Sequence, residues 1–403
     1  MDVSGDITSD ATWNVAGSPY IVRGKTNVLD GVTLTVQPGV VIKFADDALL
    51  TILGELQAHG TSIDPIHITS IHDDTIGGDT EGDGEDTAPS LFDDWGINFS
   101  FADPSSVTFT DIRFSDGMFI KNSSIAFEDV TLTQGSYGMF GSGSVVSLTR
   151  THVSDMKDGA LSFSASSVSL EDSSIEDVHH SDGIGLYSRS ILSFKDSSVT
   201  DLAFGTAIAL YDASVAEIEQ GFVSEAEICI ELYGASFMTL TDTTVSNCED
   251  YGIEFYRSEV VGSGNTIRGN GIGIYAGGKI ALTNSIIADN MRYGVYGSSI
   301  SEDVDMRGNW WGDASGPYHA AQNPSGLGDE IRENALFDPW LLEEPSDEPP
   351  PPPIAECCSN VAFIPGLQAT RLDLGGNRLW EPNSPVDTPQ LYLDEFGHPE
   401  TSG

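Results

Sequence analysis

The densest group of possible metal ligands lies in an acidic, glycine-rich stretch, residues 71–94. Its candidate ligands are Asp73, Asp74, Asp79, Glu81, Asp83 and Asp86. Carboxylates crowded in this way repel one another unless water or a cation neutralises them, and a hard ion such as Ca²⁺ suits them. The string DTEGDGED begins like a calcium loop, but Ser90 stands where an EF-hand places its bidentate Glu. The stretch therefore predicts either a Ca²⁺ site of another kind or a solvated loop.

A second titratable group is the run His179-His180-Ser181-Asp182. Histidine and aspartate are the usual general acids and bases of enzymes. Arg189, Arg257 and Arg268 fall near predicted corners, but no acidic cluster repeats on one face beside them. We expect this run to be the ordinary surface of a corner loop, with an active site as the alternative.

The histidine run and the three arginines lie in a repeat that runs from Val107 to Trp311. A small polar pair, alternating apolar residues, an Asp-like turn and a Gly-Ile-x-aliphatic-Tyr run return at intervals of 18 to 24 residues. The apolar anchors are Phe114, Leu132, Val153, Ile175, Val199, Val223, Val245, Ile267, Ile287 and Met306. A second column comprises Tyr187, Tyr211, Tyr233, Tyr256, Tyr275 and Tyr296. Repeats of this period indicate a solenoid, in which each unit buries its apolar side by stacking on the next.

The repeat has the alternation of strands and lacks the i, i+3, i+4 pattern of helices. Val, Ile, Thr, Tyr and Phe fill the strand positions, and Gly, Asp, Asn and Ser fill the corners. Because parallel crossovers are right-handed, we predict an all-β, right-handed parallel β-helix with rungs of about 18–24 residues. We expect Asp172, Asp196, Asp242 and Asn284 to serve the turns, where they could form ladders, with ligand binding as the alternative. The tyrosine column is either a stacked structural ladder or a glycan-binding face.

Composition narrows the possible functions and locations. The chain has 62 acidic and 17 basic residues and a net charge of −45, so we expect it to repel nucleic acid and anionic membranes. No apolar run is long enough to span a bilayer. The first residues lack a signal-peptide pattern, so we expect a trimmed chain or a start further upstream. Cys248 falls at a core position and Cys229 replaces a corner glycine; a disulfide between them is possible, but we favour two separate residues.

Two groups of phrases resemble a known superfamily. GVTLTVQPGVVIKF (31–44), GELQAHGT (54–61) and DPIHITS (64–70) resemble the N-terminal turns of cell-surface right-handed β-helix proteins of the pectate-lyase-like superfamily. GNWWGDASGPYH (308–319) and FDPWL (337–341) resemble their last rung and C-terminal cap. The resemblance implies a β-helix over residues 1–341, interrupted by the acidic insertion 71–94. It implies no particular chemistry, because this fold serves lyases, hydrolases, epimerases, adhesins and stalks.

An acidic segment with five consecutive prolines, Pro349 to Pro353, predicts a linker over residues 342–358. Beyond it, NVAFIPGLQATRLDLGGNRLWEPN (360–383) resembles the start of the lecithin:cholesterol acyltransferase-like α/β-hydrolases, which are serine esterases or acyltransferases. The resemblance makes residues 359–403 an N-terminal fragment of such a domain, with Leu367 and Gln368 as oxyanion-hole candidates. Ala369 stands where the family usually has Gly, and the chain contains no Gly-x-Ser-x-Gly, so we expect no esterase activity from it.

The sequence thus predicts a non-catalytic β-helix module of a larger secreted or cell-surface protein: a stalk, an adhesin or a carbohydrate-targeting domain. The alternative is a β-helix polysaccharide lyase or glycoside hydrolase. Such lyases combine Ca²⁺-binding carboxylates with an Arg or Lys base, and such hydrolases place acids on neighbouring strands. We expect polysaccharide or cell-surface glycan as the partner, Ca²⁺ as the possible cofactor, and a monomer.

Overall fold

The computed structural model describes residues 1–84, 86–91, 93–297, 304–332 and 335–345, and two short strands near the C-terminus. The chain divides into two compact units, Met1–Pro345 and Ser346–Gly403. Of the second unit, only the antiparallel pair β34 (Asp373–Leu374) and β35 (Asn377–Arg378) is described. The predicted proline run and the oxyanion-hole candidates Leu367 and Gln368 lie outside the described residues.

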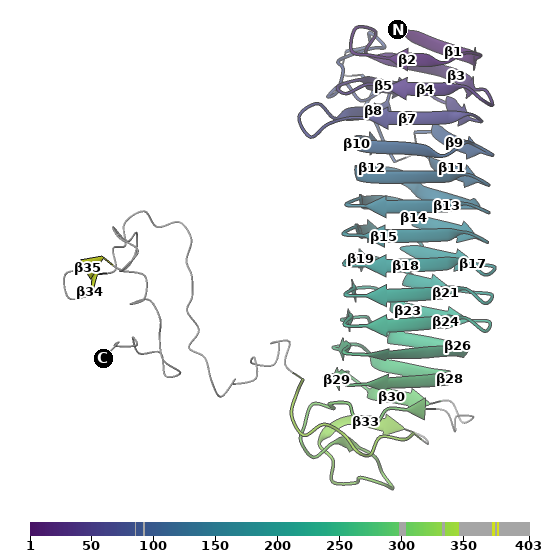
Figure 1. Ribbon diagram of the computed structural model, residues 1–403. Coiled ribbons are helices and arrows are strands. Elements are labelled where there is room, and N and C mark those ends of the chain that lie inside the picture. Colours follow the sequence, from purple (N-terminus) through teal and green to yellow (C-terminus); the bar gives the residue numbers. More distant parts are fainter. Residues whose placement is uncertain are drawn as a thin grey trace. The chain divides into compact units, whose positions relative to one another are not determined.

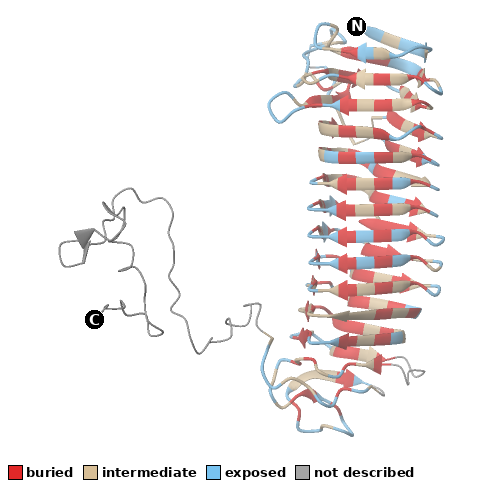
Figure 2. Ribbon diagram, in the orientation of Figure 1, coloured by how far each residue is buried: buried red, intermediate tan, exposed pale blue. Residues whose placement is uncertain are grey.

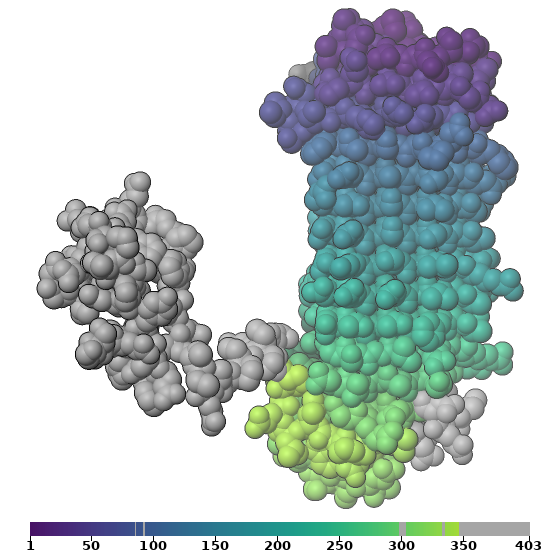
Figure 3. Space-filling view, in the orientation of Figure 1, coloured from purple at the N-terminus to yellow at the C-terminus, as the bar shows by residue number. Residues whose placement is uncertain are grey.

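The first unit is an all-β parallel solenoid of about 13 turns, and its described residues contain no helix (Figure 1). Each regular turn contributes one strand segment to each of three parallel sheets. This arrangement confirms the predicted solenoid. The space-filling view shows the turns as stacked rows of similar width along the middle of the unit (Figure 3).

We number the sheets in the order in which a turn visits them. The first sheet contains β2 (Ala11–Trp13), β4 (Thr33–Val36), β7 (Glu55–His59), β13 (Val145–Thr149), β15 (Ser167–Glu171), β18 (Ile191–Lys195), β21 (Val215–Glu219), β24 (Phe237–Thr241) and β31 (Val304–Asp305). The second contains β5 (Val41–Phe44), β8 (Ile66–Ser70), β16 (Ser174–Val178), β19 (Ser198–Leu202), β22 (Phe222–Ser224), β25 (Thr244–Ser246), β27 (Thr266–Arg268) and β29 (Ile286–Ala288).

The third sheet contains β6 (Leu49–Ile52), β9 (Gly96–Ser100), β11 (Gly117–Lys121), β17 (Ile184–Tyr187), β20 (Thr206–Leu210), β23 (Ile228–Tyr233), β30 (Tyr293–Gly297) and β33 (Gly328–Arg332). Longer strands continue round a corner and belong to more than one sheet: β1 (Asp2–Ile7), β3 (Tyr20–Val28), β10 (Ser105–Arg113), β12 (Ser124–Ser142), β14 (His152–Ser164), β26 (Tyr251–Ser263) and β28 (Ile272–Thr283). Between β8 and β9 the described residues of the acidic insertion form turns and no strand.

The predicted anchor series is confirmed in its middle and wrong at its ends. One register column of the second sheet joins Leu132, Val153, Ile175, Val199, Val223, Val245, Ile267 and Ile287. Ile112, not Phe114, pairs with Leu132, and Phe114 turns the next corner with φ 59°. Trp310 bridges Ile286, so Trp311 rather than Met306 continues the column. The end rungs differ in loop length, and counting from the Asp-like turn therefore selects the wrong residue there.

The corners need residues that tolerate a left-handed backbone. Asp172, Asp196, Asp242 and Asn284 have φ of 50°, 47°, 48° and 50° at the corner between the first and second sheets. A short polar side chain makes this conformation less costly than it is for most residues. The predicted turn role of these four residues is confirmed.

The ladders are formed by the residue that follows the left-handed one. Between the third and first sheets, the N–H of Ser144 donates to Ser166 Oγ, that of Ser166 to Ser190 Oγ, and that of Ser190 to Ser214 Oγ, each at 3.1 Å. Between the first and second sheets, the Ser173 N–H donates to Ser197 Oγ at 3.0 Å. Each hydroxyl satisfies a buried N–H that the turn leaves without a strand partner. The small inward hydroxyl forms the ladder because the Asp side chain points out of the corner.

The core lies inside the three sheets, where inward positions alternate with outward ones (Figure 2). Phe127, Phe163, Phe194 and Phe255 are among its largest fully buried side chains. Burial of each such side chain contributes about 1.5–3 kcal/mol, and neighbouring rungs share the gain.

Cys229 and Cys248 form a disulfide, with their Cα atoms 5.7 Å apart. This corrects the expectation that they remain separate. The two residues lie on adjacent rungs, beside the corner between the second and third sheets, and both are fully buried. The repeat period places them one rung apart, but only the corner geometry brings their side chains together.

The last rung carries the tryptophan phrase that resembles a C-terminal cap. Trp311 is fully buried, and the short strand β32 (Pro317–Tyr318) pairs with β33. The Trp340 ring packs on Gly316, where an added Cβ would lie 2.3 Å from the ring. Gly316 also has φ 80°, so this position needs glycine for two reasons.

Candidate functional site

Three of the six predicted calcium ligands come together in the acidic insertion. Carboxylate oxygens of Asp74, Asp79 and Asp83 lie within 4.8 Å of one another. The N–H groups of Gly82 and Gly84 donate to Asp79 and lower the pKa of its carboxyl group. Asp83 Oδ1 is buried and has no hydrogen-bond partner. Three carboxylates with one orphaned oxygen are a donor set that fits a hard cation.

The other three predicted ligands point elsewhere. Asp73 accepts hydrogen bonds from Thr69 and Thr75, and Glu81 pairs with His72 at 2.7 Å. Asp86 is exposed and belongs to no cluster of possible ligands among the described residues. The sequence grouped these residues because they are close neighbours in the chain. In the structure, Asp73 and Glu81 bond to other side chains and do not join the three-carboxylate cluster.

The acidic insertion is also bound to the solenoid beneath it. Lys43, on β5 of the second sheet, is fully buried, and its Nζ donates to the carbonyl of Gly78 at 2.5 Å. Burial lowers the pKa of this ammonium group, and Asp74 and Asp73 oppose that shift. Lys43 therefore already supplies one positive charge to the insertion.

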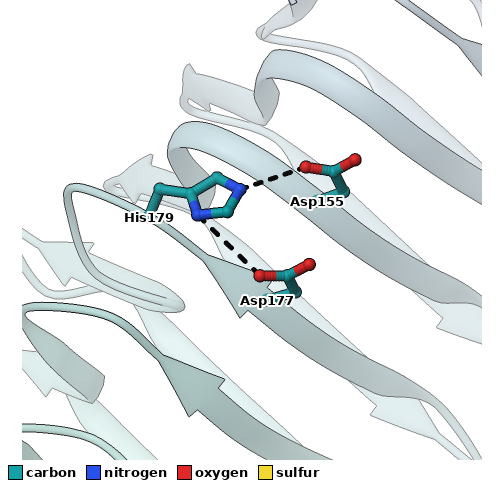
Figure 4. A group of neighbouring side chains, drawn as sticks. All are labelled: Asp155, Asp177 and His179. Carbon is teal, nitrogen blue, oxygen red and sulfur yellow. Dashed lines mark hydrogen bonds and ion pairs between the residues drawn. The ribbon is translucent and has the colours of Figure 1, made fainter.

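The histidine run does not form one site. His179 lies between two corner aspartates, with Nε2 3.0 Å from Asp155 and Nδ1 3.8 Å from Asp177 (Figure 4). His180 lies over Phe204, with ring centroids 6.4 Å apart. Asp182 turns towards the outer surface of the third sheet, where it accepts the N–H of Thr206 at 3.1 Å. Both nitrogens of His179 face carboxylates, and one possible ligand atom of each of these three side chains lies within 4.8 Å of the others, so they form a compact polar group.

The corner arginines are also separate. Arg189 and Arg257 occupy left-handed corner positions with φ of 65° and 53°. The Arg257 guanidinium lies 5.2 Å from the centroid of the Tyr256 ring. Arg268 pairs with Asp289 and Glu344. None of the three lies within a group of acids suited to proton transfer.

The outer surface of the third sheet carries two parallel columns that the sequence analysis merged into one. The first column joins Phe119, Phe140, Ser162, Gly185, Ala209, Glu231, Glu254, Tyr275 and Tyr296. The second joins Lys121, Ser142, Ser164, Tyr187, Tyr211, Tyr233, Tyr256 and Gly277. Tyr275 and Tyr296 are in register with Glu254, two residues before Tyr256, so the predicted single tyrosine column is wrong.

The tyrosine rings nevertheless follow one another along this surface in two groups with ring contacts, Tyr187 to Tyr256 and Tyr275 with Tyr296. We call the six residues together the tyrosine strip: Tyr187, Tyr211, Tyr233, Tyr256, Tyr275 and Tyr296. Ring centroids are 5.2 Å apart for Tyr187 and Tyr211, 6.2 Å for Tyr211 and Tyr233, and 5.5 Å for Tyr275 and Tyr296. The Tyr187 ring lies over Gly185, where an added Cβ would be 3.1 Å from its hydroxyl oxygen. The small residues of the first column leave room for the rings to lie along the sheet.

Two glutamates link the columns. The hydroxyl of Tyr211 donates to Glu231, and that of Tyr233 donates to Glu254 at 3.2 Å. Burial raises the pKa of the Glu231 and Glu254 carboxyl groups, although the tyrosine hydroxyls oppose the shift. Burial also raises the pKa of Asp182, and it raises that of Tyr233 to about 12. The strip therefore presents partly buried carboxyl groups that favour protonation more than ordinary ones.

A hollow of about 90 Å³ adjoins the strip. Its lining includes Phe140, Asp158, Ser162, Asp182 and Tyr187. Phe140 also lines a second hollow, of about 200 Å³, which contains Asp47, Asp94 and Asp116. The two hollows and the strip place aromatic rings and carboxyl groups along one surface.

Sequence reasoning found the tyrosines but missed Glu231, Glu254 and Phe140. Strand alternation could have revealed the glutamates, because each lies two residues before a strip tyrosine and so on the same side of its strand. Phe140 gave no comparable signal, because it lies outside the Gly-Ile-x-aliphatic-Tyr phrase.

The family described as right handed beta helix region matches residues 96–221 and 164–311, which together span more than half of the chain. The chain belongs to this family. Membership confirms the predicted right-handed β-helix.

Three known proteins are similar to parts of this chain. A stretch of 66 residues is 44% identical to Protein bark beetle of Drosophila melanogaster, and it covers 16% of this chain and 2% of that protein. The crystal structure of the periplasmic alginate epimerase AlgG superposes with a TM-score of 0.50 and 14% identity, covering 78% of each chain. A tailspike protein of E. coli bacteriophage HK620, in complex with a hexasaccharide, has a TM-score of 0.30 and 13% identity, over 69% of this chain and 57% of its own. The AlgG likeness establishes the architecture alone.

The described residues include no helix that is long and apolar enough to cross a membrane.

Proposed function

We propose that this β-helix is a carbohydrate-targeting module that acts outside the cytosol. The observation that carries the proposal is the tyrosine strip beside Glu231 and Glu254. Aromatic faces pack against the C–H faces of sugar rings, and neighbouring carboxyl groups accept hydrogen bonds from sugar hydroxyls. The strip provides both kinds of contact on one rigid sheet.

Two further observations support the proposal. The disulfide between Cys229 and Cys248 is of a kind that persists in oxidising compartments such as the periplasm or the cell exterior. The fold neighbour AlgG is a periplasmic protein named for a polysaccharide.

Affinity electrophoresis of the whole chain in gels that contain soluble polysaccharides tests this function. We expect at least one polysaccharide to retard the chain, and Tyr211→Ala to weaken the retardation strongly. Phe222→Ala is the matched control, because Phe222 is a 44% exposed aromatic residue on the second sheet. Equal effects of the two substitutions, or no retardation by any polymer, would contradict the proposal.

The second candidate is a polysaccharide lyase or glycoside hydrolase. It is favoured by Asp182 and Glu231, two partly buried carboxyl groups with raised pKa on the same surface, since a raised pKa suits a general acid. Incubation with polysaccharides and Ca²⁺, followed by the absorbance of unsaturated products and by reducing-end release, tests this candidate. Product formation that is lost in both Glu231→Gln and Asp182→Asn would establish the enzyme and refute the non-catalytic module.

We further propose that Asp74, Asp79 and Asp83 hold Ca²⁺, which would fix the acidic insertion on the solenoid. The support is the orphaned Asp83 oxygen within a three-carboxylate cluster. The test is the melting temperature of the chain with and without a chelator. A chelator that leaves the melting temperature unchanged would reject a tight site.

The resemblance of residues 360–383 to lipase-like acyltransferases adds a role for the module, which would deliver an acyl hydrolase to a glycan-bearing surface. The native gene tests this role. A reading frame that continues into Gly-x-Ser-x-Gly followed by Asp and His is expected, and a frame without them refutes it.

A further inference from the structure

The tyrosine strip has an unusual charge pattern for a polysaccharide site. Its two columns contain Glu231 and Glu254, and Asp182 and Asp158 line the adjoining hollow. Between Lys121 and Arg332 neither column holds a basic residue in the described part of the sheet. Lys157, at the edge of the hollow, is paired with Asp158 at 3.2 Å. Two guanidinium groups do touch the strip, Arg257 at 5.2 Å from the Tyr256 ring centroid and Arg332 at 5.7 Å from that of Tyr296. Both lie over tyrosine rings, while the four carboxyl groups lie beside Tyr187, Tyr211 and Tyr233, so this part of the strip is acidic.

This pattern disfavours an anionic ligand. A polyuronate such as alginate would bring one carboxylate per sugar against Glu231 and Glu254, on a chain whose net charge is −45. The repulsion would act both at contact and at long range, and salt would weaken only the long-range part. The fold neighbour's substrate class therefore does not transfer to this surface.

The hydrogen bonds of the same carboxyl groups also disfavour a cationic ligand. Glu231 accepts from Tyr211, Glu254 from Tyr233, and Asp182 from the Thr206 N–H, so neutral donors already engage all three. Burial raises the pKa of all three carboxyl groups, so their ionised form is less stable here than in water. A site built for ammonium groups would instead favour the ionised form of its carboxyl groups.

We propose that the ligand of the tyrosine strip is an uncharged polysaccharide that lies along the solenoid axis. Its sugar rings pack on the tyrosines, and its hydroxyls donate to the free oxygens of Glu231 and Glu254. This inference rests on the proposed carbohydrate-binding function and specifies its ligand class.

The geometry also sets the length of the ligand. From Tyr187 to Tyr296 the strip crosses β17, β20, β23, β26, β28 and β30. Adjacent strands lie about 4.8 Å apart, so the strip is about 24 Å long. A ligand that spans it needs several sugar units, and affinity is expected to rise with chain length until the strip is filled.

The test is affinity electrophoresis of the full chain with three classes of probe at low and high salt: neutral polymers (xyloglucan, galactomannan and hydroxyethylcellulose), alginate, and chitosan. We expect a neutral polymer to retard the chain equally at both salt concentrations. Tyr211→Ala should weaken this retardation at least tenfold, and Phe222→Ala should leave it unchanged.

Charge variants at Glu231 separate the ligand classes further. Glu231→Gln keeps an acceptor for the Tyr211 hydroxyl but replaces the other oxygen with an amide donor, so a neutral ligand should bind more weakly and an anionic ligand more tightly than to the parent chain. Glu231→Lys should weaken a neutral ligand and strengthen an anionic one.

The outcomes distinguish this inference from the broader function. Tyr211-dependent retardation by alginate, improved by Glu231→Lys, would overturn the uncharged ligand and leave carbohydrate binding intact. Retardation by chitosan alone, abolished by salt and by Glu231→Gln, would also overturn it. Retardation by none of the polymers would overturn both proposals.

Discussion

Replacing Ser190 by alanine removes one member of the serine ladder between the third and first sheets. Ser190 is fully buried; its Oγ accepts the Ser166 N–H at 3.1 Å and donates to the Tyr187 carbonyl at 2.7 Å. That carbonyl keeps a second partner, the N–H of Ala165, but the Ser166 N–H has no other acceptor among the described residues. One buried donor is thus left unsatisfied, and the expected loss is about 1–3 kcal/mol of unfolding free energy.

The matched control is Ser193→Ala. Ser193 is an exposed residue on β18 of the same rung, so its loss should change stability by less than about 0.5 kcal/mol. Urea unfolding of both variants gives the global comparison. Because a solenoid can open rung by rung, hydrogen exchange at the Ser166 amide gives the local one. Equal midpoints for the two variants, together with unchanged exchange at Ser166, would refute the ladder as a source of stability.

Three further predictions concern the disulfide, the strip and the acidic insertion. The double variant Cys229→Ala/Cys248→Ala should lose about 3 kcal/mol of unfolding free energy, as expected for cross-linked residues 19 apart. Peptide mapping of the parent chain without reductant should recover the bridged pair. Free thiols at both positions would contradict the structure. Burial raises the folded pKa of Glu231, so the folded state binds more protons than the unfolded one, and stability should fall as pH rises from the ordinary glutamate value through the folded one. Glu231→Gln should flatten that fall in pH-dependent unfolding, whereas Glu217→Gln, at an exposed position on β21, should not; identical slopes would exclude Glu231 as the cause. Ca²⁺ at 100 times its dissociation constant should stabilise the fold by about 2.7 kcal/mol. Asp79→Asn should remove that gain. In chelator, the variant and the parent chain should unfold with nearly the same free energy.

The sequence by itself determined the architecture of the first unit. Its period, its strand alternation and its Asp or Asn corners follow from physical rules that act within one rung, and these local signals recur often enough to be unambiguous. The anchors from Leu132 to Ile287 were therefore correct. The errors at Phe114 and Met306 occurred where loop length changes and a fixed count no longer reports register.

Only the tertiary structure decided which side chains meet between rungs. A shift of two residues keeps a side chain on the same side of a strand, so the sequence could not tell that Tyr275 is in register with Glu254 rather than Tyr256. The same limit applies to Cys229 and Cys248, whose pairing depends on the corner geometry of adjacent rungs. It applies also to the acidic insertion, where hydrogen bonds divide six neighbouring carboxylates and leave Asp74, Asp79 and Asp83 together. Contacts across a rung interface depend on side-chain direction and loop path, and neither is encoded by spacing alone.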